Sequence, residues 1–496
     1  MSLLLAFACG SGAPDTPLPA DAPAPVDVLV IGSGPAGAAA AWKARQDGAE
    51  VVVLERDARA GGAGLYAANH YGAATRWHAE AGIDDSASAA AEDWRAHTGG
   101  DPADPWVQLL FERSGEIISW LVDDLGAEFQ GFAGATETGG TPRMHRLGRA
   151  GSELAPVSLL TEGLDEAIRL QHQADALLVE QGAVVGASYT DLRTGEQGQV
   201  RAKAVVVATG GFARHTERVL EVRPELSPLT LHVEAGPSSD GGGLVLFEGL
   251  EVREQNLAEV GVYTHSVADP RKGFEGEVLW PVPSVKHALI VDLAGRRVAD
   301  EGRTTGFDMV DALLAAPDRR LVALVPDALY PKLRAIVPPY NRKPGERRRA
   351  LPATELTQLG ALATHADVAS AAAHWGMPAE VLTATVQRYD EHVAAGRDAD
   401  FGKDPAWLVG FGDRPVHAME LVVATAKTFG GVALDEQARV LGVDGPIPGL
   451  WAAGEVAGML GTEAIGEGLD GAITACYLTG LVAGEQAAAA ARGEAR

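Results

Sequence analysis

The sequence has 496 residues, of which 46% are hydrophobic and 22% are charged, a balance typical of folded proteins and not of disordered ones. Its 41 basic and 67 acidic side chains leave a formal net charge of −26, which argues against nucleic acid or an anionic membrane surface as the main partner. No apolar run has the length of a membrane span. The two cysteines, Cys9 and Cys476, form no cluster for zinc or iron–sulfur, and we predict no metal site.

The first 25 residues are predicted to be a tail outside the fold. A short apolar run precedes Cys9, and a stretch rich in Ser, Gly, Pro and Ala follows it. Two interpretations stay open: the unstructured tail of a cytoplasmic protein, and the remnant of a lipoprotein signal that exports the chain and anchors it through Cys9. The apolar run is shorter than the usual ~7–15 residues, and no basic residue precedes it.

A strand, a glycine-rich loop and a helix follow in direct succession. Val26 to Ile31 is an apolar, β-branched run typical of a buried parallel strand, and residues 38–47 are Ala-rich and favour a helix. In a dinucleotide-binding loop the first glycine allows a sharp turn, the second admits a pyrophosphate, and the third lets helix and strand pack closely. We predict that the loop binds a dinucleotide through Gly32, Gly34, Pro35, Ala36 and Gly37.

A second predicted strand, Val51 to Leu54, ends at an acidic residue. Glu55 lies 23 residues after Gly32, where a carboxylate accepts hydrogen bonds from the adenosine ribose. The glycine pair that soon follows suits a flavin nucleotide lying along the strand edge. We expect cofactor contacts at Glu55, Arg56, Gly61 and Gly62.

Three later segments complete the pattern. A buried strand runs from Val205 into a small-residue turn, Ser239-Asp240-Gly241 follows, and Gly430 to Asp435 leads into residues 447–458. In this order the segments resemble the fumarate reductase/succinate dehydrogenase flavoprotein family, which also contains the 3-ketosteroid dehydrogenases. The resemblance covers residues 26–490. It implies non-covalent FAD, because no counterpart of the flavin-linking histidine aligns, and further contacts at Ala208, Thr209, Gly210, Asp240, Gly454, Glu455, Gly468 and Leu469. Asp240 also suits an Asx turn.

The resemblance implies an α/β fold in which a Rossmann-like FAD-binding domain carries an inserted α+β capping domain. We assign residues 26–259 and 416–490 to the FAD-binding domain and 260–415 to the capping domain. In the family the cap is mobile, and its closure excludes water from the reacting centre. Residues 310–397 show helical periodicity. The last helix, about 470–491, is expected to aim its positive N-terminal end at the flavin.

The chain departs from the dicarboxylate-reducing members of the family. Residues 301–308 place no arginine at the proton-donor position, where Arg303 is the nearest, and the late histidine and late arginine are also missing. Burying a dianion without several fixed cations is costly, so fumarate and succinate are not expected as substrates. The acidic residues Glu463, Glu467 and Asp470 favour an uncharged or cationic substrate. The Tyr-Pro-Gly-Pro-Gly stretch of ketosteroid dehydrogenases is missing too.

Four residues are the main candidates for the proton chemistry, ahead of His70, Tyr71 and His145, which also have structural interpretations. The segment Tyr263-Thr264-His265 stands where the family has a substrate-contacting His-Pro-Thr, and a lysine near the flavin acts as an ammonium anchor or, when desolvated, as a base. Each candidate also has a structural interpretation, as a packing residue or part of a salt bridge. The candidates are His265, Arg303, Lys427 and Tyr263.

Two hypotheses from different classes follow. The first is an FAD-dependent oxidoreductase acting on CH–CH groups, which moves a hydride between flavin N5 and a carbon next to an activating group. It would desaturate or reduce an uncharged small molecule and exchange electrons with an external carrier. The second is a non-catalytic flavin-binding protein for electron transfer or partner binding. Monooxygenase and amine oxidase chemistry are disfavoured by the order of the motifs.

Overall fold

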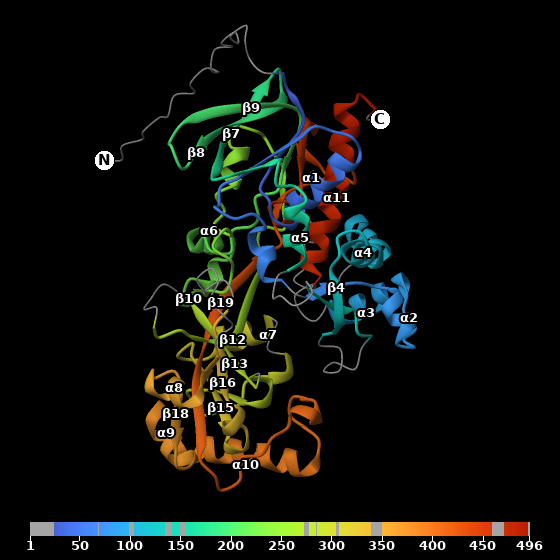
Figure 1. Ribbon diagram of the computed structural model, residues 1–496. Coiled ribbons are helices and arrows are strands. Elements are labelled where there is room, and N and C mark those ends of the chain that lie inside the picture. Colours follow the sequence, from blue (N-terminus) through green and yellow to red (C-terminus); the bar gives the residue numbers. More distant parts are fainter. Residues whose placement is uncertain are drawn as a thin grey trace, which may run out of the picture.

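The computed structural model describes residues 24–67, 69–98, 104–133, 141–148, 155–271, 277–283, 285–303, 307–338, 350–458 and 471–494. Nearly all of the predicted tail therefore lies outside the described residues. Figure 1 shows three lobes: a first lobe around α1, α11 and β9, a second lobe below it around β12, β15 and β19, and a third, smaller lobe with α2–α4 beside them.

The first lobe is built on an eight-stranded sheet with the order β21-β22-β9-β1-β2-β6, in which β8 also pairs with β9 and β7 pairs with β8. Its central strands are parallel, and their apolar residues are buried on both faces, as such strands require. The strands are β1 (Val26–Ile31), β2 (Val51–Glu55), β6 (Ile168–Leu170), β7 (His172–Glu180), β8 (Ala183–Asp191), β9 (Gln197–Val207), β21 (Arg439–Gly442) and β22 (Gly445–Ala452).

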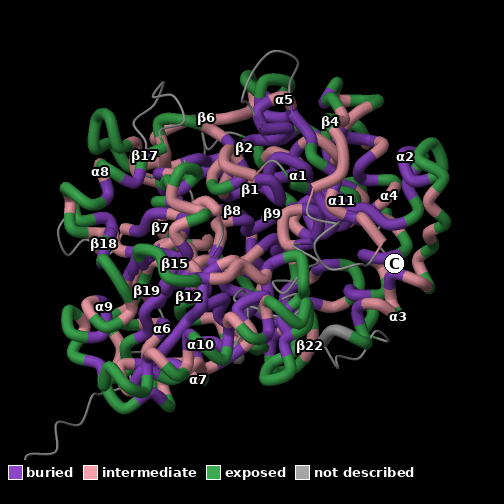
Figure 2. Tube along the Cα trace, turned by 90° about the horizontal axis from the view of Figure 1, so that it is seen from below, coloured by how far each residue is buried: buried purple, intermediate pink, exposed green. Residues whose placement is uncertain are grey.

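Two helices, α1 (Pro35–Gln46) and α11 (Ala472–Ala491), pack against each other in the first lobe. Small residues permit the close approach: a Cβ added at Gly480 or Gly484 would come within 2.2 or 2.3 Å of a carbonyl oxygen of α1. In Figure 2 the strands β1 and β9 and parts of both helices form the buried interior. The predicted strand–loop–helix succession is thus present, with α1 starting at Pro35 because proline suits the first helical turn.

The second lobe is built on a nine-stranded sheet with the order β14-β15-β19-β12-β13-β16-β17, and β10 and β18 also pair with β19. The 13-residue strand β19 runs through the middle of it (Figure 1). The strands are β10 (Leu231–Val233), β12 (Val260–Ala268), β13 (Val278–Val282), β14 (Leu289–Asp292), β15 (Leu321–Pro326), β16 (Arg334–Ile336), β17 (Ala350–Pro352), β18 (Ala363–His365) and β19 (Val416–Thr428).

Two apolar clusters lie on the two faces of this sheet. Along β15, Leu321 and Ala323 pack into one cluster and Val322 and Leu324 into the other, as the alternation of side chains in a strand requires. The helical periodicity expected over 310–397 is therefore wrong for β15, because a short run that is buried on both faces does not differ from a buried helix in its pattern. It is also wrong for the short strands β16, β17 and β18. It holds for the helices α7 (Phe307–Ala315), α8 (Ala353–Gln358), α9 (Val368–Trp375) and α10 (Ala379–Ala395).

The third lobe joins the three-stranded sheet β3-β5-β4 to helices that the sequence analysis did not assign. Its elements are β3 (Asn69–Tyr71), α2 (Arg76–Glu80), α3 (Ala87–Thr98), α4 (Pro105–Asp123), β4 (Glu128–Phe132) and β5 (Met144–Gly148). The remaining short helices are α5 (Pro156–Glu162) and α6 (Thr216–Val222), and a two-stranded ladder joins β11 (Glu254–Gln255) to β20 (Gly431–Val432). None of the helices in the described part of the chain is both long and apolar enough to cross a bilayer.

The predicted boundaries at 260 and 415 fall next to strands that share one sheet. β12 starts at Val260 and β19 starts at Val416, and the two strands are paired. The second sheet thus includes a strand that the prediction gives to the FAD-binding domain. The division into domains stays a prediction.

Candidate active site

A cavity of about 1100 Å³ extends from the glycine-rich loop of the first lobe to the second sheet. The carboxyl ends of β1, β2 and β9 form one end of it, which is where ligands bind to open parallel sheets. Side chains from β12, β13 and β19 form the other end, and β5 of the third lobe also contributes. Twelve of the predicted cofactor residues line it: Gly32, Gly34, Pro35, Ala36, Glu55, Arg56, Gly62, Ala208, Thr209, Gly210, Gly454 and Glu455.

The three glycines of the loop have different surroundings. Gly32 has a φ of +99°, and a Cβ added there would come within 2.4 Å of the Ala208 oxygen. At Gly37 an added Cβ would come within 2.0 Å of the Gly32 oxygen, so this glycine serves packing and does not line the cavity. At Gly34 it would meet no described atom within 4 Å. The loop therefore packs tightly against neighbouring backbone at Gly32 and Gly37 and leaves open space at Gly34. A diphosphate site needs this open space next to backbone N–H groups.

Both helices that reach the cavity begin with a glycine N-cap. Gly34 precedes α1 and Gly471 precedes α11, so neither N-cap residue has a side chain that could accept from the first N–H groups of its helix. The first residues of α11, Ala472 and Ile473, line the cavity. Uncapped N–H groups and the positive helix end favour a negatively charged ligand.

Glu55 is held in place at the end of β2. Its Oε2 accepts hydrogen bonds from Ser33 N (2.9 Å) and Ser33 Oγ (2.5 Å), and its Oε1 accepts one from Asp57 N (2.8 Å). Arg56 forms an ion pair with Asp240 at 2.9 Å. Asp240 does not line the cavity, and its Oδ1 accepts a hydrogen bond from Gly242 N at 3.0 Å, which is the Asx turn that the sequence left as the alternative.

The two glycines after β2 have different surroundings, and only Gly62 faces the dinucleotide loop. Gly61 has a φ of +113°, lies against Leu65 and does not line the cavity. A Cβ on Gly62 would come within 3.2 Å of the Gly34 Cα, so this glycine faces the dinucleotide loop. On the other side of the loop, Thr209 Oγ1 is buried and has no hydrogen-bond partner among the described residues.

At the second-lobe end of the cavity, three of the four proton-chemistry candidates come together. Tyr263 and His265 project from β12 and Lys427 from β19, and all three line the cavity. The rings of Tyr263 and His265 lie 5.4 Å apart. Arg303 ends a short 3-10 helix, Glu301–Arg303, and its side chain lies outside the described part of the chain. The cofactor candidates Gly468 and Leu469 also lie outside it, as do Glu463, Glu467 and Asp470.

The sequence analysis missed several groups at this end. Glu234 follows β10, Trp280 lies on β13 and Lys286 lies in the short 3-10 helix Val285–His287; all three line the cavity. Glu234 Oε1 lies 3.1 Å from His265 Nε2. No local pattern marks Glu234, because its partner is 31 residues away and only the pairing of β10 and β12 with β19 brings them together.

Glu455 lies at the first-lobe end of the cavity and interacts electrostatically with Lys427 of the second sheet. Burial raises the pKa of its carboxyl to about 7, against the opposing effect of Lys427. Burial also strongly raises the pKa of the Cys476 thiol, on the second turn of α11. A buried carboxyl with a pKa near neutral exchanges protons readily at physiological pH.

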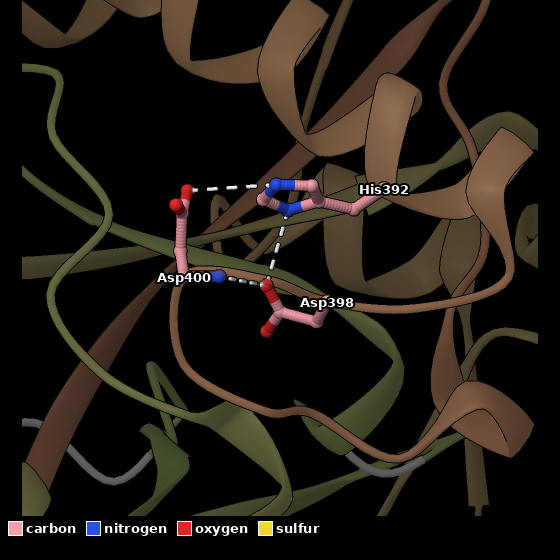
Figure 3. Close-up of side chains that lie close together, drawn as sticks. All are labelled: His392, Asp398 and Asp400. Atoms are coloured by element: carbon pink, nitrogen blue, oxygen red, sulfur yellow. Dashed lines mark hydrogen bonds and ion pairs between the residues drawn. The ribbon is translucent and has the colours of Figure 1, made fainter.

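One cluster outside the cavity has the residue types of a metal site. His392, at the end of α10, lies 3.0 Å from Asp398 and 3.8 Å from Asp400, and Figure 3 shows the ring between the two carboxylates. Each carboxylate is already paired with an arginine, Asp398 with Arg297 and Asp400 with Arg388. The cluster therefore ties α10 to the following loop and carries no argument for a metal ion.

The residues present fit FAD. The open front of Gly34, the uncapped helix ends and the buried, unpartnered Thr209 hydroxyl provide donors along one cavity wall, and Glu55 provides an acceptor. Residues 27–468 match the family model described as FAD binding domain. The chain belongs to this FAD-binding family.

Relatives of known activity support the same assignment. The chain is 29% identical over 479 residues to an NADH:fumarate oxidoreductase of Klebsiella pneumoniae (94% of this chain, 48% of that protein). It is 29% identical over 475 residues to a cytochrome-type fumarate reductase of Shewanella frigidimarina (92% and 76%). It thus spans about half of the length of the first relative and about three quarters of the second.

A solved structure is similar to the whole chain. The 3-ketosteroid Δ4-(5α)-dehydrogenase from Rhodococcus jostii RHA1, in complex with 4-androstene-3,17-dione, aligns with a TM-score of 0.72 and 25% identity, covering 93% of this chain and 96% of that one. The protein is an FAD-dependent oxidoreductase, and the predicted α/β class and family resemblance are confirmed.

Proposed function

We propose that the protein adds hydrogen to, or removes it from, a carbon–carbon bond next to an activating group of a small molecule. The observation that supports this function best is the cavity itself. One continuous space joins the dinucleotide loop to a group of titratable side chains on the second sheet. The similarity to proteins named fumarate reductase and ketosteroid dehydrogenase supports the same class of reaction.

Non-covalent FAD is proposed to lie along the first-lobe wall, where it would supply a hydride donor and acceptor. The N–H groups at the start of α1 would bind its diphosphate and Glu55 its ribose. The start of α11, with Gly454 and Glu455, would face the flavin, where a positive helix end stabilises the anionic reduced form. An external carrier is proposed to exchange the electrons.

The substrate is proposed to be uncharged and to lie against the second sheet. Among the described residues at this end, Glu234 offsets the charge of His265 and Glu455 partly offsets that of Lys427, so that with Lys286 only a small net positive charge is left. A dianion would need several cations in excess. Tyr263 and Lys427, which line this end of the cavity, are proposed to orient a carbonyl oxygen, and the second lobe would exclude water from the reacting atoms.

The experiment that tests this function is anaerobic. The FAD-loaded protein is photoreduced and mixed by stopped flow with enones, unsaturated acids, steroids and acyl compounds. Reoxidation by at least one activated alkene, with the saturated product recovered, is the expected result. Normal FAD content without reoxidation by any of them would favour a non-catalytic electron-transfer or partner-binding protein instead.

A further inference from the structure

Glu234 and His265 form a buried pair at the second-lobe end of the cavity. His265 Nε2 lies 3.1 Å from Glu234 Oε1, and Ser266 Oγ donates to Glu234 Oε2 at 2.8 Å. The Glu234 side chain is 8% exposed and that of His265 is 23% exposed, and both line the cavity. The carboxylate is thus withdrawn behind the ring that the cavity reaches.

A strand irregularity makes this arrangement possible. In a regular strand His265 and Ser266 would point to opposite faces. The register of β12 against β19 shifts between Tyr263 and Ser266, and both side chains reach the same carboxylate. Irregularities of this kind redirect side chains and occur often next to active sites.

Each member of the pair stabilises the charged form of the other. Burial alone would raise the pKa of Glu234, but His265 and hydrogen bonds from Ser266 and Trp280 lower it overall. Burial alone would lower the pKa of His265, yet the Glu234 carboxylate raises it overall, with Lys286 opposing. The ring nitrogen Nδ1 is buried and has no hydrogen-bond partner among the described residues, so Glu234, on the Nε2 side, is the described group that favours the protonated ring.

We propose that His265 is the catalytic acid and base of the reaction and that Glu234 is its positioning residue. This inference rests on the function proposed above. In the direction of reduction, the Nε2–H bond of the His265 imidazolium would break and its proton would form a C–H bond at one carbon, while bound FAD would supply the hydride for the other carbon. His265 is left neutral and regains a proton from water. The electron pair comes from the external carrier, and desaturation is the reverse.

The other candidates fit this role less well. Lys427 acts on the Glu455 carboxyl, whose pKa it lowers against the effect of burial, and it is proposed above to orient the substrate. The hydroxyl of Tyr263 lies near Gly261, because a Cβ added there would come within 3.2 Å of it. Histidine is also the side chain whose ordinary ionisation lies closest to physiological pH, which suits it to donate and accept protons there.

The first test measures the pair without turnover. Ring ¹⁵N NMR titration of the full-length, FAD-loaded protein follows its 13 histidines, and the His265 signal is identified by its loss in His265→Gln. We expect a pKa above the ordinary 6.5 and a decrease of about 1 unit or more in Glu234→Gln. An unchanged pKa in that variant would overturn the role of Glu234.

The second test separates proton transfer from hydride transfer. Hydride addition to a nitroalkene leaves a stable nitronate anion, which needs no acid from the protein, whereas an enone needs one. His265→Gln should reduce the rate of enone reduction by about 10²–10⁴-fold and spare that of nitroalkene reduction. In Glu234→Gln the enone rate should fall off at lower pH than in the wild type, because the acid form of His265 is lost earlier. His232→Gln, on β10 but outside the cavity lining, is the matched control and should behave as wild type.

The remaining outcomes of the two tests overturn either the proposed function or only the role of His265. Wild-type protein that reduces neither acceptor would overturn the proposed function. Full enone reduction by His265→Gln, or loss of both reactions with FAD still bound, would overturn only the acid–base role, the latter by assigning His265 to substrate binding. A misfolded variant is recognised by its loss of FAD, and then His265→Asn is used in its place with the same criteria.

Discussion

The two ends of the cavity are built in different ways. The first-lobe end consists largely of backbone: glycines without side chains, helix N-termini with glycine N-caps, and the carboxyl ends of β1, β2 and β9. The second-lobe end consists of side chains on β10, β12 and β19, which are far apart in sequence and meet only in the folded sheet. A site that is built from glycines and backbone N–H groups tolerates few substitutions, because most side chains would fill it. In a site that is built from side chains, a single substitution can change the chemistry. Cofactor use is thereby fixed, and substrate choice is free to vary.

The largest effect expected from this contrast is at Gly37. In Gly37→Ala the new Cβ would come within 2.0 Å of the Gly32 oxygen, so the turn must move. We expect loss of FAD and a decrease in stability of about 4 kcal/mol or more. Gly34→Ala is the matched control, because its Cβ has open space among the described residues; it should keep the fold and only weaken FAD binding. Absorbance of bound FAD and the Tm of the apoprotein measure both, and a stable, yellow Gly37→Ala would contradict the cradle.

A smaller effect, dependent on pH, is expected at Glu455. Its pKa is raised from 4.5 to about 7 by burial, so the folded apoprotein binds this proton more tightly than the unfolded chain does. The resulting stability is present below about pH 4.5 and is lost as the pH rises through about 7, a change of about 3 kcal/mol. Glu455→Gln should flatten this part of the pH profile of the apoprotein Tm. Identical profiles for variant and wild type would show that the carboxyl is not held as described.

The smallest effect is expected at the ion pair of Arg56 and Asp240. Both side chains are partly exposed, and such pairs contribute about 0–1 kcal/mol. Asp240→Asn should therefore change FAD affinity by less than about tenfold. The control is Asp123→Asn, which breaks an exposed pair with Arg76 away from the cavity and should leave FAD affinity unchanged. Loss of FAD in Asp240→Asn would mean that this carboxylate contacts the cofactor directly.

The sequence was most informative where the chemistry is local. The order β1, loop, α1, β2 and Glu55 could be predicted because each element is defined by its own residues and their spacing. β15 was taken for a helix because six consecutive apolar residues carry no period. Glu234 was missed because an acid after a three-residue strand has no distinctive neighbours, and its role depends on a contact with His265 that only the second sheet creates.

Strand β19 has a consequence for how the protein moves. β19 (Val416–Thr428) is hydrogen-bonded to β10, β12, β15 and β18, so we expect the strands of this sheet to keep their positions relative to one another. Lys427, Tyr263 and His265 lie on strands of this sheet, and Glu234 follows β10, which is paired with β19. Any swing of the second lobe therefore carries the proton-handling groups together and unchanged toward the first lobe. If the second lobe moves, the reactive arrangement would then depend on the distance between this sheet and the first lobe, and the spacing of the groups on the sheet would stay as it is.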